Sequence, residues 1–313
     1  MADVLILHPG AMGAGVASCL ASNGHRVHWV TGGRSSDTRR RAQSVEAIGH
    51  DTMEGALSTI TGPENTGLDN TGLDKTGYIL SICPPDNALE IASAVADAAA
   101  GSDRAERMVF VDCNAIAPVT MRAAASVVAK TTEGRLAVVD GGIVGPPPLA
   151  TAPGQLPSTR LFLAGTRTKE VAALFAGSSL GAVVLDDSSG ESSGIGSASA
   201  LKMVYAAWTK GSAALMLEVA AAADAHGVLA ALFAEWAISK PDLEGQLLRA
   251  AATSAPKAWR WKGEMEEIAA TFAEKGLPAG MPLGAAEVYR RLADCKDQDP
   301  PPPLSQVIGR LLS

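Results

Sequence analysis

The sequence lacks the cysteine patterns, the excess of positive charge and the long apolar runs that characterise several large classes of protein. Its four cysteines among 313 residues form no CxxC pair and stand at no ligand-like spacing from a histidine. This pattern predicts no metal site and no disulfide framework, and it favours a reducing cytoplasm. The formal net charge of −7 argues against nucleic acid or an anionic membrane as the main partner, because both require a basic surface.

Two further absences concern membranes and secretion. No stretch approaches about 20 apolar residues free of charge and glycine, so no membrane span is expected. The apolar beginning, ADVLILHPGAM, is short, has no basic leader and continues into a glycine-rich loop, which argues against a signal peptide. With 47% hydrophobic residues, a chain of this length can bury a sizeable core and is expected to form about two domains.

The first part of the chain alternates short apolar runs with helical patterns, and the last part is helical throughout. We therefore expect an α/β Rossmann domain with a predominantly parallel sheet over residues 1–190. An all-α domain is expected over residues 191–313, and a long interdomain helix over 194–227 joins the two. The predicted strands are 3–8, 27–30, 78–83, 108–112, 136–140, 160–164 and 182–185, and the later helices are 229–239, 242–252, 258–275, 283–294 and 304–312.

A glycine-rich turn follows the first predicted strand. The sequence HPGAMGAG carries Gly10, Gly13 and Gly15 and leads into a helix and a second strand. Glycines in this context let the backbone approach a pyrophosphate, which then lies at the positive end of the helix. His8 stands where the usual fingerprint has its first glycine, so a turn of another α/β protein remains an alternative. The residues expected to bind the dinucleotide here are Gly10, Ala11, Met12 and Gly13.

The residues after the second strand predict which nicotinamide cofactor binds. NAD sites usually place an acid there, whereas an arginine nearby favours the 2′-phosphate of NADP. The sequence TGGRSSD has no acid at the strand end and offers Thr31, Arg34 and Ser35 as donors, while Asp37 comes later and is expected to cap the next helix. NADP is therefore the expected cofactor. An ordinary basic start of a helix is the alternative.

Three further strand ends are expected to surround the nicotinamide and the substrate, because ligands of open parallel sheets bind beyond the carboxyl ends of the strands. Each of these segments alone is more often a plain loop, and only their common position favours a site. Trp208 and Met265, from the helical domain, are expected to contact the substrate, with core packing as the alternative. The strand-end residues are Cys83, Pro84, Pro85, Asn114, Ile143, Val144 and Gly145.

Together these motifs resemble the β-hydroxyacid dehydrogenase superfamily, which includes 3-hydroxyisobutyrate and 6-phosphogluconate dehydrogenases and is related to imine reductases. The C-terminal part looks most like a branch whose last domain is related to that of 6-phosphogluconate dehydrogenase. The resemblance implies a homodimer with interlocking helical domains. The motifs that carry it are HPGAMG, SICPP, DCNAIAP, DGGIVGPPP and GIGSASALKMVYAAWTKG.

The chain also departs from the family at positions that matter for chemistry. Lys202 is kept, but Tyr205, Ala206 and Thr209 stand where the phosphogluconate enzymes have His, Asn and Glu. The second acid is therefore missing, and oxidative decarboxylation of 6-phosphogluconate is not expected. Pro146 and Pro147 stand where the family holds a carboxylate with backbone N–H groups. Because proline has no N–H, the substrate is expected to depend less on a carboxylate.

These features predict an NADP-dependent oxidoreductase that interconverts a carbonyl and an alcohol, because imine reductases of the family generally lack the lysine. Lys202 would be the general acid/base, Asn114 would orient substrate or nicotinamide, and Tyr205 would assist through a hydrogen bond. Three alternatives stay open: a structural Lys202 paired with Glu191, an imine reductase, and a dinucleotide-binding sensor without turnover. The tandem repeat NTGLD between residues 62 and 77 is expected to be a surface loop without assigned function.

Overall fold

The computed structural model describes residues 1–61, 76–149, 155–185, 194–296 and 298–313. The chain forms two compact units, residues 1–202 and 203–313. The division falls inside the long helix, after Lys202, whereas the sequence places the boundary at residue 190. Both copies of the tandem repeat NTGLD lie outside the described residues.

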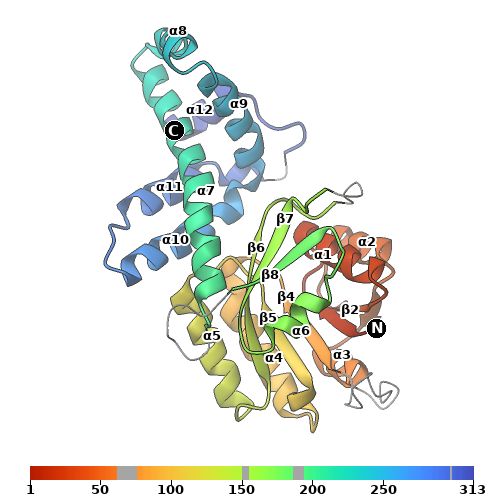
Figure 1. The fold of residues 1–313 in the computed structure, drawn as a ribbon. Helices are drawn as coiled ribbons and strands as arrows, with labels where there is room; N and C mark the ends of the chain where they lie inside the picture. The colour runs from red at the N-terminus through yellow and green to blue at the C-terminus, as the bar shows by residue number, and fades with distance from the viewer. Residues whose placement is uncertain (62–75, 150–154, 186–193, 297) are drawn as a thin grey trace. The chain divides into compact units, whose positions relative to one another are not determined.

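The N-terminal unit is built on an eight-stranded sheet with the order β3-β2-β1-β4-β5-β6-β7-β8 (Figure 1). All neighbouring strands are parallel except β6 and β7, which are antiparallel. The predicted Rossmann sheet is confirmed. The strands are β1 Asp3–Ile6, β2 Arg26–Val30, β3 Ile48–His50, β4 Gly77–Ser81, β5 Met108–Asp112, β6 Ala137–Val144, β7 Thr159–Gly165 and β8 Leu180–Val184.

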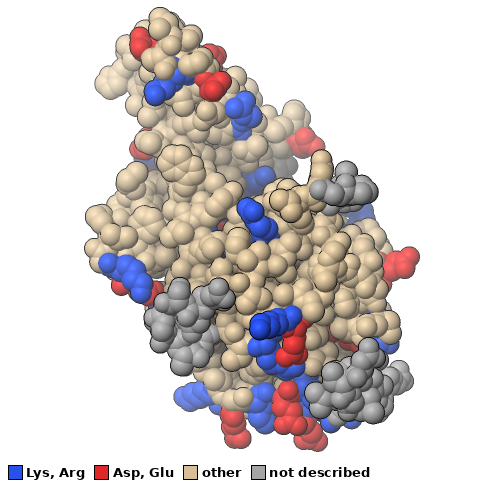
Figure 2. Space-filling view, viewed as in Figure 1, with Lys and Arg blue, Asp and Glu red and all other residues tan. Residues whose placement is uncertain are grey.

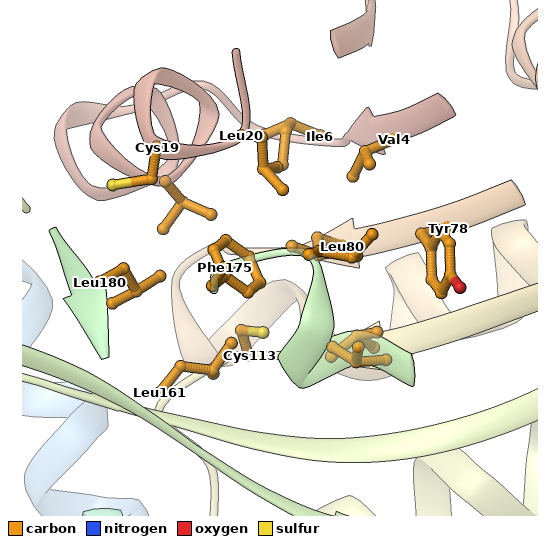
Figure 3. Close-up of a cluster of buried hydrophobic side chains, with 14 of the residues drawn as sticks. Val4, Ile6, Cys19, Leu20, Tyr78, Leu80, Cys113, Leu161, Phe175 and Leu180 are labelled. Atoms are coloured by element: carbon orange, nitrogen blue, oxygen red, sulfur yellow. The ribbon is translucent and has the colours of Figure 1, made fainter. Parts of the chain in front are cut away.

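Helices cover both faces of this sheet, because successive strand residues point to opposite sides. Val4 and Ile6 pack in one buried cluster with α1 and α6, whereas Leu5 and Leu7 pack in another with α3, α4 and α5. Figure 3 shows the first cluster, in which Leu20, Leu80 and Phe175 are labelled. The helices are α1 Ala11–Ser22, α2 Ser36–Ser44, α3 Met53–Ile60, α4 Ala88–Ala100, α5 Pro118–Thr131 and α6 Thr168–Ala173, with short 3-10 turns at Pro85–Asn87 and Ala105–Arg107.

Several elements of this unit differ from the sequence prediction. β3, α3 and α4 are absent from it; a three-residue strand and an eight-residue helix are too short to give a clear period. The strands β1, β4 and β8 have bounds that differ by one to two residues from the predicted ones. β6 extends through Gly141 and Gly142 to Val144, beyond the predicted end at residue 140. The extension forms because β7 pairs alongside these glycines, from Gly141 opposite Leu163 to Val144 opposite Arg160.

The C-terminal unit is helical throughout, as predicted. The helix predicted over 283–294 begins earlier, at Gly280, and ends at Arg291. Pro282 therefore lies in its first turn, where the N–H that proline lacks would have no partner within the helix. No helix among the described residues is long and apolar enough to cross a membrane. The helices are α7 Ser197–Ala225, which begins in the N-terminal unit, α8 Leu229–Ser239, α9 Leu243–Ser254, α10 Ala258–Glu274, α11 Gly280–Arg291 and α12 Leu304–Leu312, with 3-10 turns at Ala255–Lys257 and Ala293–Cys295.

Candidate functional site

The predicted site residues of the N-terminal unit lie at one edge of the sheet. β1, β2, β4, β5 and β6 are mutually parallel, so their carboxyl ends meet at the same edge. Figure 2 shows that most of the viewed surface is uncharged and that acidic and basic residues are intermixed on it. The segments that the structure brings to the edge are Gly10 to Gly13, Thr31 to Ser35, Cys83 to Pro85, Asn114 and Ile143 to Gly145.

The turn from β1 into α1 depends on two glycines. A Cβ atom at Gly13 would lie 2.2 Å from the carbonyl oxygen of His8, and one at Gly15 would lie 2.7 Å from Cδ of Pro148. Gly10 is the N-cap residue of α1, and no side chain in the described structure caps this end. The first-turn N–H groups of Ala11, Met12 and Gly13 are therefore available to an anion such as a pyrophosphate.

His8 adds no positive charge to this turn. Burial lowers the pKa of its imidazole to about 4, and the neighbouring Arg34 acts in the same direction. The ring is therefore neutral at pH 7. The attraction of an anion to this turn comes from the N–H groups of α1 rather than from a charged histidine.

Arg34 lies between the ends of β1 and β2. Its Nη2 atom donates to the carbonyl oxygen of Leu7 at 3.1 Å, and its Nε atom donates to that of Val30 at 3.4 Å. The hydroxyl of Thr31 donates to the carbonyl of His50 at 3.1 Å. The guanidinium therefore occupies the strand ends where dinucleotide-binding folds hold the ribose of the cofactor.

Helix α2 begins differently from the prediction. The side chain of Ser35, not that of Asp37, caps it, accepting from the N–H of Thr38 at 3.3 Å. Asp37 lies in the first turn and pairs with Arg40. A serine hydroxyl at the N-cap reaches the backbone N–H two or three residues later, whereas an acid inside the first turn favours the helix only through its charge.

Asn114 is 2% exposed and connects the ends of β4 and β5. Its Oδ1 atom accepts from the N–H of Cys83 at 2.6 Å, and its Nδ2 atom donates to the hydroxyl of Ser81 at 3.0 Å. The backbone N–H of Asn114 donates to Oδ1 of Asp112 at 2.9 Å. Through these hydrogen bonds Asn114 fixes the backbone where the segment Cys83 to Pro85 begins. Its direct contact with substrate or nicotinamide stays a prediction.

Two buried carboxylates stand side by side in this edge of the sheet. Asp112 of β5 pairs in register with Asp140 of β6. Burial raises the pKa of Asp112 to about 7, and the charge of Asp140 acts in the same direction. Burial also raises the pKa of Asp140, although hydrogen bonds from Ser199, Gly196 and Ala198 oppose it. Asp112 is therefore partly protonated near pH 7, whereas the hydrogen bonds that Asp140 accepts favour its ionised form.

The titration of Asp112 predicts a pH-dependent stability. Its pKa is about 7 in the folded protein against an ordinary value of 3.8, so the folded state binds the proton more tightly and stability falls as the pH rises from about 4 to 7. The full loss is about 4 kcal/mol, at about 1.4 kcal/mol per unit of pKa. Asp112→Asn keeps the acceptor for Asn114 and cannot titrate. We expect urea unfolding at pH 5 and pH 8 to show a smaller decline for the variant, and parallel declines would contradict this assignment.

Lys202 is partly buried and lies one turn into α7. Its ammonium donates to the carbonyl oxygen of Ile143, near the carboxyl end of β6. A Cβ atom at Gly142 would lie 2.5 Å from the carbonyl oxygen of Ala198 and 3.2 Å from Cβ of Lys202. The start of α7 therefore packs directly on the backbone of β6. Glu191, the alternative partner of Lys202, lies outside the described residues.

The remaining predicted residues belong to the C-terminal unit. Tyr205 is 50% and Trp208 77% exposed, whereas Met265 is buried. Trp208 and Met265 both line an apolar groove of about 670 Å³ between α7, α10 and α11. The sequence interpretation missed a buried ion pair in this unit, between Lys210 and Glu264, with the Lys210 ammonium 5.2 Å from the centre of the Trp261 ring.

Comparisons with known proteins agree with this architecture. Residues 223–292 match a family model described as a domain of unknown function, DUF1932. The structure is similar to 3-hydroxyisobutyrate dehydrogenase from Mycobacterium tuberculosis, with 15% identity, all of both chains covered and a TM-score of 0.63. A conserved protein of unknown function, described as structurally similar to 3-hydroxyacid dehydrogenases, shares 24% identity over 93% of this chain and 97% of its own, with a TM-score of 0.60.

The chain has the β-hydroxyacid dehydrogenase fold. A reductive aminase from Aspergillus terreus, solved in complex with NADPH and ethyl levulinate, shares this fold with 17% identity, 99% of both chains covered and a TM-score of 0.52. A search of curated proteins finds no match. The resemblance seen in the sequence motifs is thus confirmed at the level of the fold.

The sequence interpretation did not single out two buried carboxylates at this end of the sheet. Asp140 is buried and accepts hydrogen bonds from the first turn of α7, and Asp112 binds the backbone of Asn114. The available signal was an acid at the end of each of two apolar runs, MVFVD and LAVVD. Among the described residues, no group of three or more His, Cys, Asp or Glu could hold a metal ion.

Proposed function

We propose that the protein is an NADP-dependent oxidoreductase that interconverts a carbonyl and an alcohol, with Lys202 as general acid/base. The observation that supports this most directly is the position of the Lys202 ammonium. It donates to the carbonyl of Ile143 near the carboxyl end of β6, the edge of the sheet that also carries the uncapped start of α1. A cofactor with its pyrophosphate at α1 and its nicotinamide along this edge would bring its reactive ring towards the lysine.

The residues present fit a nicotinamide dinucleotide. Gly13 allows the tight turn before α1, and no side chain competes for the N–H groups of its first turn in the described structure. When bound, the cofactor supplies or accepts the hydride. Lys202 would donate a proton to the carbonyl oxygen as it becomes an alcohol, and would accept that proton in the reverse direction. Asn114 would keep the Cys83 to Pro85 segment in place.

Imine reduction is the second candidate, since the Aspergillus terreus reductive aminase solved with NADPH has the same fold. A dinucleotide-binding sensor without turnover is the third. Steady-state turnover with NADPH against aldehydes, ketones and cyclic imines separates them. Carbonyl reduction supports the proposal, reduction of imines alone supports the second candidate, and NADPH binding without turnover across the panel supports the third. Tyr205, Trp208 and Met265 lie in the C-terminal unit, and their part in substrate binding stays a prediction.

The choice of NADP over NAD makes a prediction about Arg34. Its guanidinium lies at the carbonyl oxygens of Leu7 and Val30, beside the expected place of the ribose. A charge-assisted contact with the 2′-phosphate contributes about ten- to a hundredfold in affinity. We expect Arg34→Ala to weaken NADPH by about this factor and to leave NADH nearly unchanged, as measured by fluorescence titration. The control is Arg40→Ala, since Arg40 is exposed and pairs with Asp37. Equal affinities of the wild type for NADPH and NADH would contradict the cofactor assignment.

A homodimer built mainly by the helical domain is also part of this proposal. Val204, Trp208, Leu215 and Val219 are exposed along one face of α7, at spacings of four, seven and four residues, and Met281 of α11 lines the groove beside them. Such a contiguous apolar face is typical of a protein interface. We expect light scattering at micromolar concentration to give twice the chain mass of 31.9 kDa.

Trp208→Glu should weaken this dimer by at least about tenfold, because it places a charge at the centre of the apolar face. Ile238→Glu is the matched control, since Ile238 is 82% exposed but lies on α8, away from the α7 face. A wild-type protein that stays monomeric at these concentrations, or two variants that dissociate equally, would rule out this interface.

A further inference from the structure

Asp140 has no assigned role in the proposed reaction, yet its carboxylate holds the start of the helix that carries Lys202. We propose that Asp140 is a positioning residue: it fixes the first turn of α7 to β6 and so determines where the Lys202 ammonium lies. This inference rests on the proposed function of Lys202. It assigns to Asp140 an effect on turnover that acts through the lysine and not through the cofactor.

Both carboxylate oxygens of Asp140 accept hydrogen bonds from the start of α7. The residue is fully buried. Its Oδ2 atom accepts from the backbone N–H groups of Gly196 and Ala198, both at 2.9 Å, and from that of Ser199 at 3.1 Å. Its Oδ1 atom accepts from the hydroxyl of Ser199 at 2.7 Å. The first N–H groups of a helix have no partner within it. The Asp140 carboxylate accepts hydrogen bonds from three N–H groups at the start of α7, and its negative charge lies at the positive end of the helix dipole.

The capping acid comes from a strand and not from the residues next to the helix. Gly194 and Gly196, which precede α7, have no side chain that could cap it. A serine or aspartate beside the helix would satisfy the same N–H groups without attaching them to anything else. Asp140 lies 56 residues before Gly196, so the same hydrogen bonds also tie the helix to β6.

Two further contacts carry this attachment to Lys202. Gly142 lies on the same face of β6 as Asp140, because side chains alternate along a strand, and its missing side chain lets Ala198 and Lys202 pack against the strand. The next residue, Ile143, accepts from the Lys202 ammonium. Three neighbouring positions on β6 therefore hold α7 at its first turn, at the Cβ of Lys202 and at the end of the lysine side chain.

This matters because lysine is a flexible proton donor. Its ammonium sits on a four-carbon chain, and a displacement of about 1 Å of a catalytic group can cost about a hundredfold in rate. A helix start that moved relative to β6 would move the proton donor relative to the strand edge where the cofactor is expected. The nucleotide turn belongs to β1 and α1, which Asp140 does not touch among the described contacts, so cofactor affinity should be insensitive to it.

The test is a double-mutant cycle. Asp140→Asn keeps the shape and one acceptor oxygen but turns an NH₂ group towards the N–H groups of α7. We expect at least a tenfold loss of kcat in the wild-type background, with the Kd of NADPH within threefold. In the Lys202→Met background the same change should cost less than threefold, because the residue it positions is gone. Equal losses in both backgrounds would show a general structural role and overturn the proposal. If Asp140→Asn fails to fold, Ser199→Ala, which removes only the 2.7 Å hydroxyl contact, takes its place with the same expected non-additivity.

A readout without turnover keeps this inference distinct from the proposed function. Asp140→Asn should speed hydrogen exchange of the amides of residues 196–199 at least tenfold, measured without cofactor. Asp3→Asn is the matched control: Asp3 is another buried carboxylate of the N-terminal unit, bound to Arg26 and His28 at the start of β1, and its loss should leave those amides and kcat unchanged. Unchanged exchange in Asp140→Asn overturns the inference whatever the turnover shows. Faster exchange together with full activity of Lys202→Met shows instead that the lysine assignment is wrong.

Discussion

Lys202→Met is expected to lower kcat by at least about a hundredfold while the affinity for NADPH stays nearly unchanged. A hydride transferred to a carbonyl leaves a negative oxygen that needs a proton donor within hydrogen-bond reach, and such a donor contributes about a hundred- to ten-thousandfold in rate. Methionine keeps the length and apolar stem of lysine and is a good helix former, so α7 should persist. The measurement is steady-state turnover of the best substrate from the carbonyl and imine panel.

The control for this prediction is Lys130→Met. Lys130 lies in the last turn of α5 and is exposed, so its loss removes a positive charge from the same unit without touching the edge of β6. We expect its kcat to match that of the wild type. If folded Lys202→Met keeps more than about a tenth of wild-type turnover, Lys202 is not the acid/base. That result would favour an imine reductase or a dinucleotide-binding sensor over a carbonyl reductase.

Gly13→Ala is expected to have the second large effect, on both stability and cofactor binding. Its Cβ atom would lie 2.2 Å from the carbonyl oxygen of His8, which is a backbone atom, so the turn itself must move. Forcing atoms into a packed site costs about 1–3 kcal/mol, and alanine otherwise favours a helix over glycine by about 1 kcal/mol. A loss of stability therefore has to come from this contact. NADPH affinity should fall by at least about a hundredfold, because the first-turn N–H groups of α1 lose their common direction.

Gly10→Ala is the matched change in the same turn. Nothing lies within 4 Å of a Cβ atom at Gly10, and the residue has a negative φ of −67°. Its free energy of unfolding, measured in urea without cofactor, should stay within about 0.5 kcal/mol of the wild-type value. Two variants with the same unfolding free energy would show that the turn at Gly13 adapts, and the argument from close approach to His8 would fail.

The elements that the sequence predicted best are those whose signal is local. β5 has the predicted bounds, and so do α8 and α12, because apolar runs and helical periods between glycine and proline residues describe them without reference to the rest of the fold. β3 was missed because its three residues, Ile48 to His50, are mostly exposed at the sheet margin and carry no alternation.

The sequence predicted individual residues of the candidate site better than the hydrogen bonds between them. Asn114 and Lys202 could be singled out by position and by resemblance. Their partners could not, since Asn114 meets Cys83 31 residues away and Lys202 meets Ile143 59 residues away. Ser35 was assigned to the cofactor and Asp37 to the helix cap, whereas the structure gives the cap to Ser35. Hydrogen bonds between residues so far apart in the sequence depend on the order of the strands in the sheet. Neither a hydrophobic period nor a short motif indicates that order.

The contact between Gly15 and Pro148 bears on protein engineering. Gly15 is in α1 and Pro148 follows β6, and the ring of the proline lies where a side chain at residue 15 would begin. A grafted loop that leaves this space empty would no longer require glycine at position 15, and alanine there would favour the helix by about 1 kcal/mol. Changing Gly15 alone would push the loop away. The two positions have to be changed together, so a loop transplanted after β6 requires a matching residue at position 15.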